Sequence, residues 1–141
     1  MEEMFQEFRD IADFRIVYIR EAHAVDSNRP SPPARDKNIF EHEDFGQRCK
    51  TAEMLIQDNE LTIPFLIDSM DNKTDKAYSA KPDRAFLVDG KGKLAVAGAR
   101  GPRGFGPALN DIEQWLSKFR EKKEVSSNNN RIDDIVEADG R

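Results

Sequence analysis

The sequence predicts an α/β fold with a mixed sheet. Stretches with apolar residues at helical spacing alternate with short stretches rich in β-branched and aromatic residues, in the order helix, strand, helix, strand, hairpin, helix. The 141 residues, 38% hydrophobic and 35% charged, suit one globular domain with a compact core. We place this domain at residues 1–122 and expect the polar residues 123–141 to form a disordered tail.

The first predicted elements are a helix over residues 1–12 and a strand over residues 14–19. The helix has acidic residues in its first turn and gathers a set of apolar residues on one face, namely Met4, Phe5, Phe8, Ile11 and Ala12. The strand is rich in β-branched and aromatic residues, as is typical of a mostly buried strand. Over residues 26–37 we expect a loop, because its prolines exclude regular structure.

The middle of the chain predicts a second helix and a second strand. The helix is expected over residues 45–59, with an inward face made of Cys49, Ala52, Leu55 and Ile56. The strand is expected over residues 63–68. After it, Asp75 is predicted to cap a brief helical turn over residues 77–80.

The last predicted elements are a hairpin and a helix. Residues 84–88 and 94–97 form the strands of the hairpin, and the turn between them contains glycines that allow a positive φ. A glycine-rich loop over residues 98–107 then leads to an amphipathic helix over residues 108–120.

The charge distribution limits the kinds of partner that the chain is expected to bind. It has 22 basic and 27 acidic residues, a net charge of -5, and no stripe of basic residues. This argues against a nucleic-acid partner and favours a small organic or redox partner. The chain also lacks both an apolar run of about 20 residues and a signal-peptide pattern, so as written it is expected to be soluble.

Cysteine and histidine are scarce. The single cysteine, Cys49, cannot form an internal disulfide, which favours a reduced, intracellular protein. Two histidines and one cysteine are too few for a closed metal site of about four ligands. We therefore expect no metal and no bound cofactor.

Glu21 and His23 stand two residues apart at the C-terminal end of the first predicted strand, where α/β folds place their sites. An alternating strand points both side chains to the same side, and a carboxylate can orient a histidine that titrates near neutrality. The two residues are therefore a candidate acid/base pair. The structural alternative is that Glu21 is a solvated carboxylate and that His23 is a histidine near a helix whose hydrogen bonds are made by neighbouring groups.

A series of ordered motifs runs through the chain. They are Ala12-Asp13-Phe14, Tyr18-Ile19-Arg20-Glu21-Ala22-His23, His42 with Cys49 seven residues later, Asp68-Ser69-Met70-Asp71-Asn72, Ala77-Tyr78, Pro82-Asp83-Arg84, Gly98-Ala99-Arg100-Gly101-Pro102 and Trp115-Leu116. In order and spacing they resemble the iodothyronine deiodinase family and its bacterial relatives, over roughly residues 5–120.

The resemblance implies a thioredoxin-like or peroxiredoxin-like fold whose first strand ends at a selenocysteine or cysteine. On the family's usual spacing, that residue lies about nine positions before Met1, so we expect the first strand and the attacking atom to be missing here. Three explanations stay open: a gene model that starts at an internal methionine, a fragment, or a noncatalytic paralogue. We favour the first, because omitting a strand leaves an unpaired sheet edge.

The resemblance also implies roles for four residues. It assigns Glu21 and His23 to proton transfer, and it assigns His42 and Arg100 to a clamp on the polar groups of the substrate. An arginine fork suits a carboxylate or a phenolate. Taken without the resemblance, His42 is a loop histidine just before a helix, and Arg100 is a solvated charge.

Three further features receive no catalytic role. We interpret Cys49 as a buried, inert thiol on its helix, with a resolving role as the open alternative. The glycines of residues 98–106 lack the Lys-Ser/Thr that follows in a phosphate-binding loop, so we interpret them as a turn that presents Arg100. Tyr18 and Tyr78 either border the site or pack in the core.

The resemblance predicts an oxidoreductase that removes iodide from an iodothyronine such as thyroxine, or from a related halogenated phenol, with an external thiol as reductant. A soft selenolate or thiolate takes the iodine as a formal cation, and a histidine delivers the proton. The alternatives are a noncatalytic thioredoxin-like binding paralogue and a thiol peroxidase-like redoxin. The resemblance also leaves room for a homodimer, and for membrane association if an anchor precedes Met1.

Overall fold

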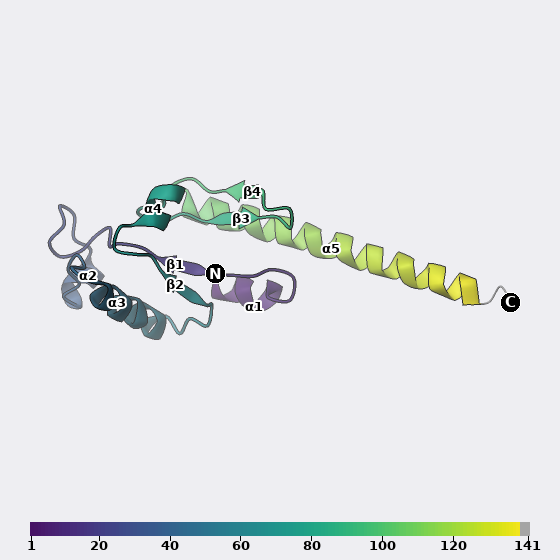
Figure 1. Ribbon diagram of the computed structural model, residues 1–141, viewed down its shortest axis with the longest axis horizontal. Helices are drawn as coiled ribbons and strands as arrows, with labels where there is room; N and C mark the ends of the chain where they lie inside the picture. Colours follow the sequence, from purple (N-terminus) through teal and green to yellow (C-terminus); the bar gives the residue numbers. More distant parts are fainter. Residues whose placement is uncertain (139–141) are drawn as a thin grey trace.

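The computed structural model describes residues 1–138, and side chains through residue 126. Helices and short strands alternate along this part of the chain (Figure 1). The elements are α1 (Glu2–Phe8), β1 (Ile16–Tyr18), α2 (Pro32–Asp36), α3 (Phe45–Asp58), β2 (Phe65–Ile67), α4 (Lys73–Tyr78), β3 (Phe86–Val88), β4 (Leu94–Ala97) and α5 (Phe105–Ala138). The predicted α/β class is confirmed, and the arrangement is consistent with a thioredoxin-like fold.

The strands pair in two ways. β1 and β2 are parallel, with Val17 opposite Leu66, while β3 and β4 are antiparallel, with Leu87 opposite Val96. Parallel and antiparallel pairing therefore both occur among the described strands, although not within one mixed sheet. The pairs form two separate sheets, because no strand among residues 1–138 pairs with the remaining edge of β1 or β3.

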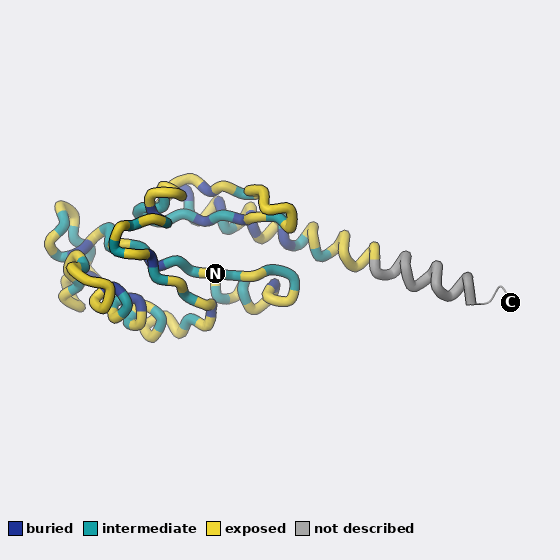
Figure 2. Tube along the Cα trace, in the orientation of Figure 1, coloured by how far each residue is buried: buried dark blue, intermediate teal, exposed yellow. Residues whose placement is uncertain are grey.

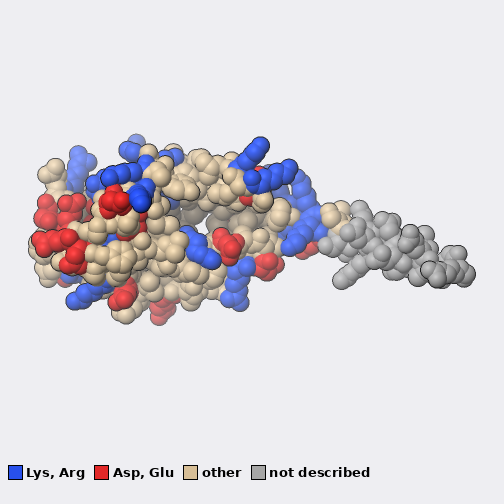
Figure 3. Space-filling model, in the orientation of Figure 1, with Lys and Arg blue, Asp and Glu red and all other residues tan. Residues whose placement is uncertain are grey.

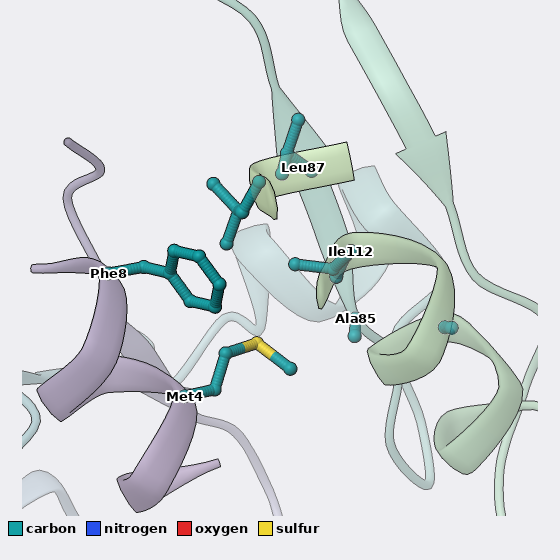
Figure 4. Packing of buried hydrophobic residues seen from close by; sticks show 7 residues of the cluster. Met4, Phe8, Ala85, Leu87 and Ile112 are labelled. Atoms are coloured by element: carbon teal, nitrogen blue, oxygen red, sulfur yellow. The ribbon is translucent and has the colours of Figure 1, made fainter. Parts of the chain in front are cut away.

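The main core joins the first helix to the last. Met4 and Phe8 of α1 point toward Leu87 of β3 and Ile112 of α5 (Figure 4). Phe8 and Leu116 are the largest fully buried side chains of the described residues. This burial of apolar surface explains why a seven-residue helix is stable, since so short a helix is marginal by itself.

Two elements near the N-terminus differ from the prediction. The helix expected over residues 1–12 ends at Phe8, and its last turn is followed by hydrogen bonds from Ile11 N and Ala12 N to Phe8 O. The loop expected over residues 26–37 contains the short helix α2, so the exclusion of regular structure there was wrong. Its prolines occupy the first helical positions, where no intrahelical N–H is needed.

The helix after β2 also begins earlier than predicted. α4 starts at Lys73, whereas a turn over residues 77–80 was expected. Asp75 lies inside this helix, so its predicted role as a cap was wrong. The carboxylate of Asp68 accepts from Thr74 N at 2.9 Å and from Asp75 N at 3.0 Å, and it thereby satisfies the first turn of the helix.

The inward face of α3 contains a charged residue that apolar spacing does not reveal. The residues of this helix that are buried are Arg48 and Ala52. Leu55, which was predicted to face inward, is exposed, and Cys49 is half-buried. An arginine therefore occupies the position at which α3 meets the rest of the fold.

The last helix extends beyond its predicted end at residue 120. Its backbone is helical to Ala138, through a segment for which composition predicts disorder, and residues 139–141 lie outside the described residues. Residues 121–126 are all exposed, where the helix leaves the body of the molecule (Figure 2). The boundary between a domain and a tail at residue 122 stays a prediction.

Charges are distributed unevenly over the face seen in Figure 3. Acidic side chains gather at the end that carries α2, and basic side chains gather where α5 leaves the body. No helix of the described residues has both the length and the apolar character that crossing a membrane requires.

Candidate functional site

A polar cluster lies at the C-terminal end of β1. Tyr18, the last residue of this strand, is only 9% exposed, and its hydroxyl donates a hydrogen bond to Oε1 of Glu21. Burial, and then the hydrogen bond and charge of Glu21, raise the pKa of Tyr18, although Arg48 opposes this. Tyr18 is therefore a protonated donor at neutral pH, and it holds the Glu21 carboxylate at the strand end.

His42 lies against this cluster. Its ring centroid is 6.0 Å from that of Tyr18, and its Nε2 is 3.1 Å from Oγ1 of Thr51. The Thr51 hydroxyl donates to Gln47 O at 3.1 Å. Because the single hydroxyl proton of Thr51 is used there, Nε2 of His42 must be the donor to Oγ1.

The protonation of His42 follows from its surroundings. Burial lowers its pKa and Arg48 lowers it further, while the carboxylates of Glu21 and Glu41 act in the opposite direction without reversing the result. With the proton of the neutral ring on Nε2, Nδ1 presents a lone pair. Nδ1 is buried and has no hydrogen-bond partner among the described residues. A hydroxyl group from a bound molecule can supply that partner.

His23 lies on the surface, apart from Glu21. Its Nδ1 is 2.8 Å from Arg29 O, and since a carbonyl only accepts, Nδ1 carries the donated proton. No hydrogen bond joins Glu21 to His23 among the described residues, so the structure does not form the predicted direct pair. The reason is that β1 ends at Tyr18 and the chain then bends, so strand alternation no longer applies.

Arg100 lies in the loop between β4 and α5. It is exposed, and its Nε lies 3.4 Å from Ser79 O, just after α4. The loops after β1, β2 and β4 come to the same end of the molecule (Figure 1). No contact joins Arg100 to His42 in the described part of the chain.

Arg48 is a further residue of the candidate site, and the sequence pattern did not predict it. It is 2% exposed, and its Nη1 donates to Asp68 O at 2.9 Å and to Ser69 O at 2.7 Å. Its Nη2 lies 3.1 Å from Oδ1 of Asn72. Its burial could have been predicted from its position four residues before Ala52, because residues at this spacing lie on the same face of a helix.

A second charged contact supports the strand end. Nε of Arg20 lies 2.8 Å from Oδ2 of Asp75, whose side chain is buried within α4. The other carboxylate oxygen of Asp75 accepts from Lys81 N at 3.1 Å. Arg20 directly precedes Glu21, so α4 fixes the backbone that carries the candidate acid/base residue.

The family of the chain is settled by comparison with known proteins. The family model described as "Iodothyronine deiodinase" matches residues 1–120. The chain belongs to the iodothyronine deiodinase family. This match confirms the resemblance inferred from the ordered motifs.

Individual deiodinases agree with this assignment. The chain is 32% identical over 125 residues to a type II iodothyronine deiodinase of Neoceratodus forsteri. The matched region covers 86% of this chain and 45% of that protein. The chain is 32% identical over 114 residues to the thyroxine 5-deiodinase of Gallus gallus, covering 81% and 42%. A type I enzyme of Xenopus laevis is 32% identical over 120 residues, covering 85% and 44%. The chain spans less than half the length of these relatives.

The cluster gives this deiodinase-family chain a defined set of proton donors and acceptors. Tyr18 is a protonated donor to the Glu21 carboxylate, and His42 is a neutral ring with a free acceptor. His23 keeps Nε2 for an outside partner, since Nδ1 is bound to Arg29. These groups can transfer a proton and accept a hydroxyl group.

Proposed function

We propose that the chain is the proton-transfer and substrate-binding part of an oxidoreductase that removes iodide from an iodothyronine such as thyroxine, or from a related halogenated phenol. In the net reaction, a carbon–iodine bond is replaced by a carbon–hydrogen bond. Two external thiols become a disulfide, and iodide and a proton are released. The observation that supports this most is the Tyr18, Glu21 and His42 cluster in a chain that the deiodinase family matches over residues 1–120.

Glu21 and His23 take the proton-transfer role in this proposal. The carbon that loses iodine must receive a proton, and an imidazole supplies one most readily near neutral pH. Because Nδ1 of His23 donates to Arg29 O, Nε2 is the atom left for transfer. The exposed position of His23 suits a residue that exchanges protons with solvent between turnovers.

His42 and Arg100 take the substrate-binding role. The unpartnered Nδ1 of His42 matches the hydroxyl hydrogen of an iodinated phenol, which is a donor. The exposed guanidinium of Arg100 matches a carboxylate, such as the one on the amino-acid end of thyroxine. His42 lies beside Tyr18 at the end of β1, and Arg100 lies beside Ser79, just after α4.

The nucleophile is assigned outside these 141 residues. The single cysteine, Cys49, is half-buried on α3, and we give it no catalytic role. We place the attack on iodine at a selenocysteine or cysteine in a preceding segment. Homodimer formation and membrane anchoring through such a segment belong to the same proposal.

Two measurements test the proposed function. The coding DNA upstream of Met1 should contain a strand-coding segment that ends in an in-frame TGA or cysteine codon followed by codons for Pro-Pro-Phe. The protein that includes this segment should release iodide from radioiodinated thyroxine in the presence of dithiothreitol. His23→Ala should reduce that release by roughly 100-fold or more, and Cys49→Ser, the control, should retain it.

The alternatives give different results in the same assays. Thyroxine binding without iodide release by the extended protein would support a noncatalytic thioredoxin-like binding module. Thiol-dependent consumption of peroxide without deiodination would support a thiol peroxidase-like redoxin. Full iodide release by His23→Ala would remove His23 from the mechanism.

A further inference from the structure

The guanidinium of Arg48 is buried without a compensating carboxylate. Its three hydrogen bonds go to two backbone carbonyls and to the neutral amide of Asn72. No carboxylate forms an ion pair with it among the described residues, and its Nε is buried with no partner there. Arginine stays charged at every pH at which a protein folds, so the guanidinium of Arg48 keeps its positive charge although it is buried. The carboxylates of Asp68 and Asp75 are also buried in this part of the molecule, but neither forms an ion pair with Arg48.

α3 carries both Arg48 and the residue that anchors His42. Thr51 follows Arg48 by three positions, so the two lie on the same side of the helix. Thr51 Oγ1 is hydrogen-bonded to Nε2 of His42, and the ring centroid of His42 is 6.0 Å from that of Tyr18. One face of α3 therefore supplies the anchor for His42 and a positive charge near it.

Three charged groups act on His42. Glu21 and Glu41 favour a proton on the ring, while Arg48 disfavours one, in the same direction as burial. If Arg48 were absent, two carboxylates would act on a histidine with no opposing charge. The histidine would then gain a second proton more readily, and Nδ1 would become a donor.

We propose that Arg48 is a positioning residue that keeps His42 an uncharged hydrogen-bond acceptor toward the substrate. This proposal rests on the proposed function. It explains why Nδ1 of His42 can accept a hydrogen bond from a phenolic hydroxyl. Arg48 acts through charge and also through position, because its bonds to Asp68 and Ser69 join α3 to the end of β2. A purely structural arginine would have only the second effect.

The state of His42 can be measured by ¹⁵N NMR of the 141-residue chain, with its signals assigned by comparison with His42→Gln. In the unmodified chain at pH 7, His42 should show a protonated Nε2 and an unprotonated Nδ1. Arg48→Gln should raise the midpoint of the His42 titration by roughly one pH unit. Arg48→Lys, which retains the charge but not the planar fork, should keep the midpoint near that of the unmodified chain.

Arg84→Gln is the matched control. Arg84 also donates to two backbone carbonyls, Gly98 O and Tyr78 O, but it is not among the charges that act on His42. Its replacement should leave the His42 midpoint unchanged. An equal rise in the Arg84 and Arg48 variants would show a general effect of destabilisation and overturn the proposal.

Two further results would overturn the proposal about Arg48. An unchanged midpoint in folded Arg48→Gln overturns the proposal, as does a proton on Nδ1 of His42 in the unmodified chain at pH 7. If Arg48→Gln does not fold, Arg48→Met takes its place, because it also removes the charge; a raised His42 midpoint in this variant supports the proposal, and an unchanged midpoint overturns it. The titration needs no substrate, so a failure of iodide release would contradict the proposed function without altering this result.

Discussion

The Tyr18 hydroxyl donates a hydrogen bond to the carboxylate of Glu21, three residues further along the chain. This bond spans the point where β1 ends and the chain bends away. It directs Glu21 back toward the strand and toward His42, whose pKa the Glu21 charge affects. Tyr18, Glu21 and His42 are thus grouped at the end of β1.

Tyr18→Phe should lower the free energy of unfolding by about 1–2 kcal/mol, because the half-buried Glu21 carboxylate loses its donor. Urea denaturation followed by circular dichroism measures this. Tyr78→Phe is the control: the ring of Tyr78 packs on Phe86 at 5.0 Å, and its hydroxyl has no hydrogen bond to the described residues. The control should change stability by less than about 0.5 kcal/mol. Equal losses in both variants would contradict a special role for the Tyr18 hydroxyl.

Asp68 should make stability depend on pH. Burial raises its pKa, but the backbone N–H groups of Asp75 and Thr74 more than offset this, so the pKa is lowered overall. A carboxyl group with a lowered folded-state pKa stabilises the fold above its unfolded pKa of about 3.9. That contribution is lost as the pH falls through the folded-state value.

Asp68→Asn tests this linkage. The variant should be less stable by about 1 kcal/mol at pH 7, as for the loss of a helix cap, and the difference should narrow as the pH falls below about 4. Denaturant unfolding at several pH values measures the difference. Hydrogen bonds from Thr62 and Gln6 lower the pKa of Glu2 to about 2. Glu2 titrates in both proteins, so its contribution cancels from the difference in stability between them. A difference that is the same at pH 7 and pH 3 would contradict the assignment.

Gly104→Ala should displace the loop that carries Arg100. An added Cβ would lie 2.3 Å from Ala99 O and 2.4 Å from its carbonyl carbon, and this backbone can yield only if the loop moves. We expect a loss of about 1–3 kcal/mol in denaturant unfolding. Gly106→Ala is the control, because a Cβ there meets nothing within 4 Å. Its stability should be unchanged or higher by up to about 1 kcal/mol.

Arg20→Met should destabilise the strand end by about 1–3 kcal/mol, since it removes an ion-pair partner of a carboxylate that is only 5% exposed. Arg15→Met removes a surface pair, in which the Asp13 side chain is 91% exposed and the two charged atoms are 3.6 Å apart. The surface variant should lose less than about 0.5 kcal/mol. Thermal or urea unfolding of both variants measures the contrast, and similar losses would show that Asp75 does not depend on Arg20.

Local pattern predicted the centres of the elements better than their ends. The strand around Val17 and the helix around Ala52 are confirmed, because periodicity reports the inward face of a segment. The prolines before Ala34 were taken to exclude a helix, although proline is tolerated in the first turn. Asp75 was taken as a cap, whereas Asp68 on the preceding strand end performs that function.

The sequence predicted which residues belong to the candidate site but not how they contact one another. Glu21, His23, His42 and Arg100 were named from motifs, and their roles stay predictions. The partner of Glu21 was expected to be His23, and the structure gives it Tyr18. Arg48 was missed, because an arginine on a helix is normally solvated and only its three long-range hydrogen bonds show that it is buried.

The sequence by itself determined the α/β class and the deiodinase family, because periodicity and ordered motifs are properties of the chain alone. Only the tertiary structure decided that Glu21 turns to Tyr18, that Nδ1 of His42 is left as an acceptor, and that Arg48 is buried beside them. The physical reason is that burial and hydrogen-bond partners arise between segments far apart in sequence. They set the charge of each group through desolvation and neighbouring charges, which no local pattern contains.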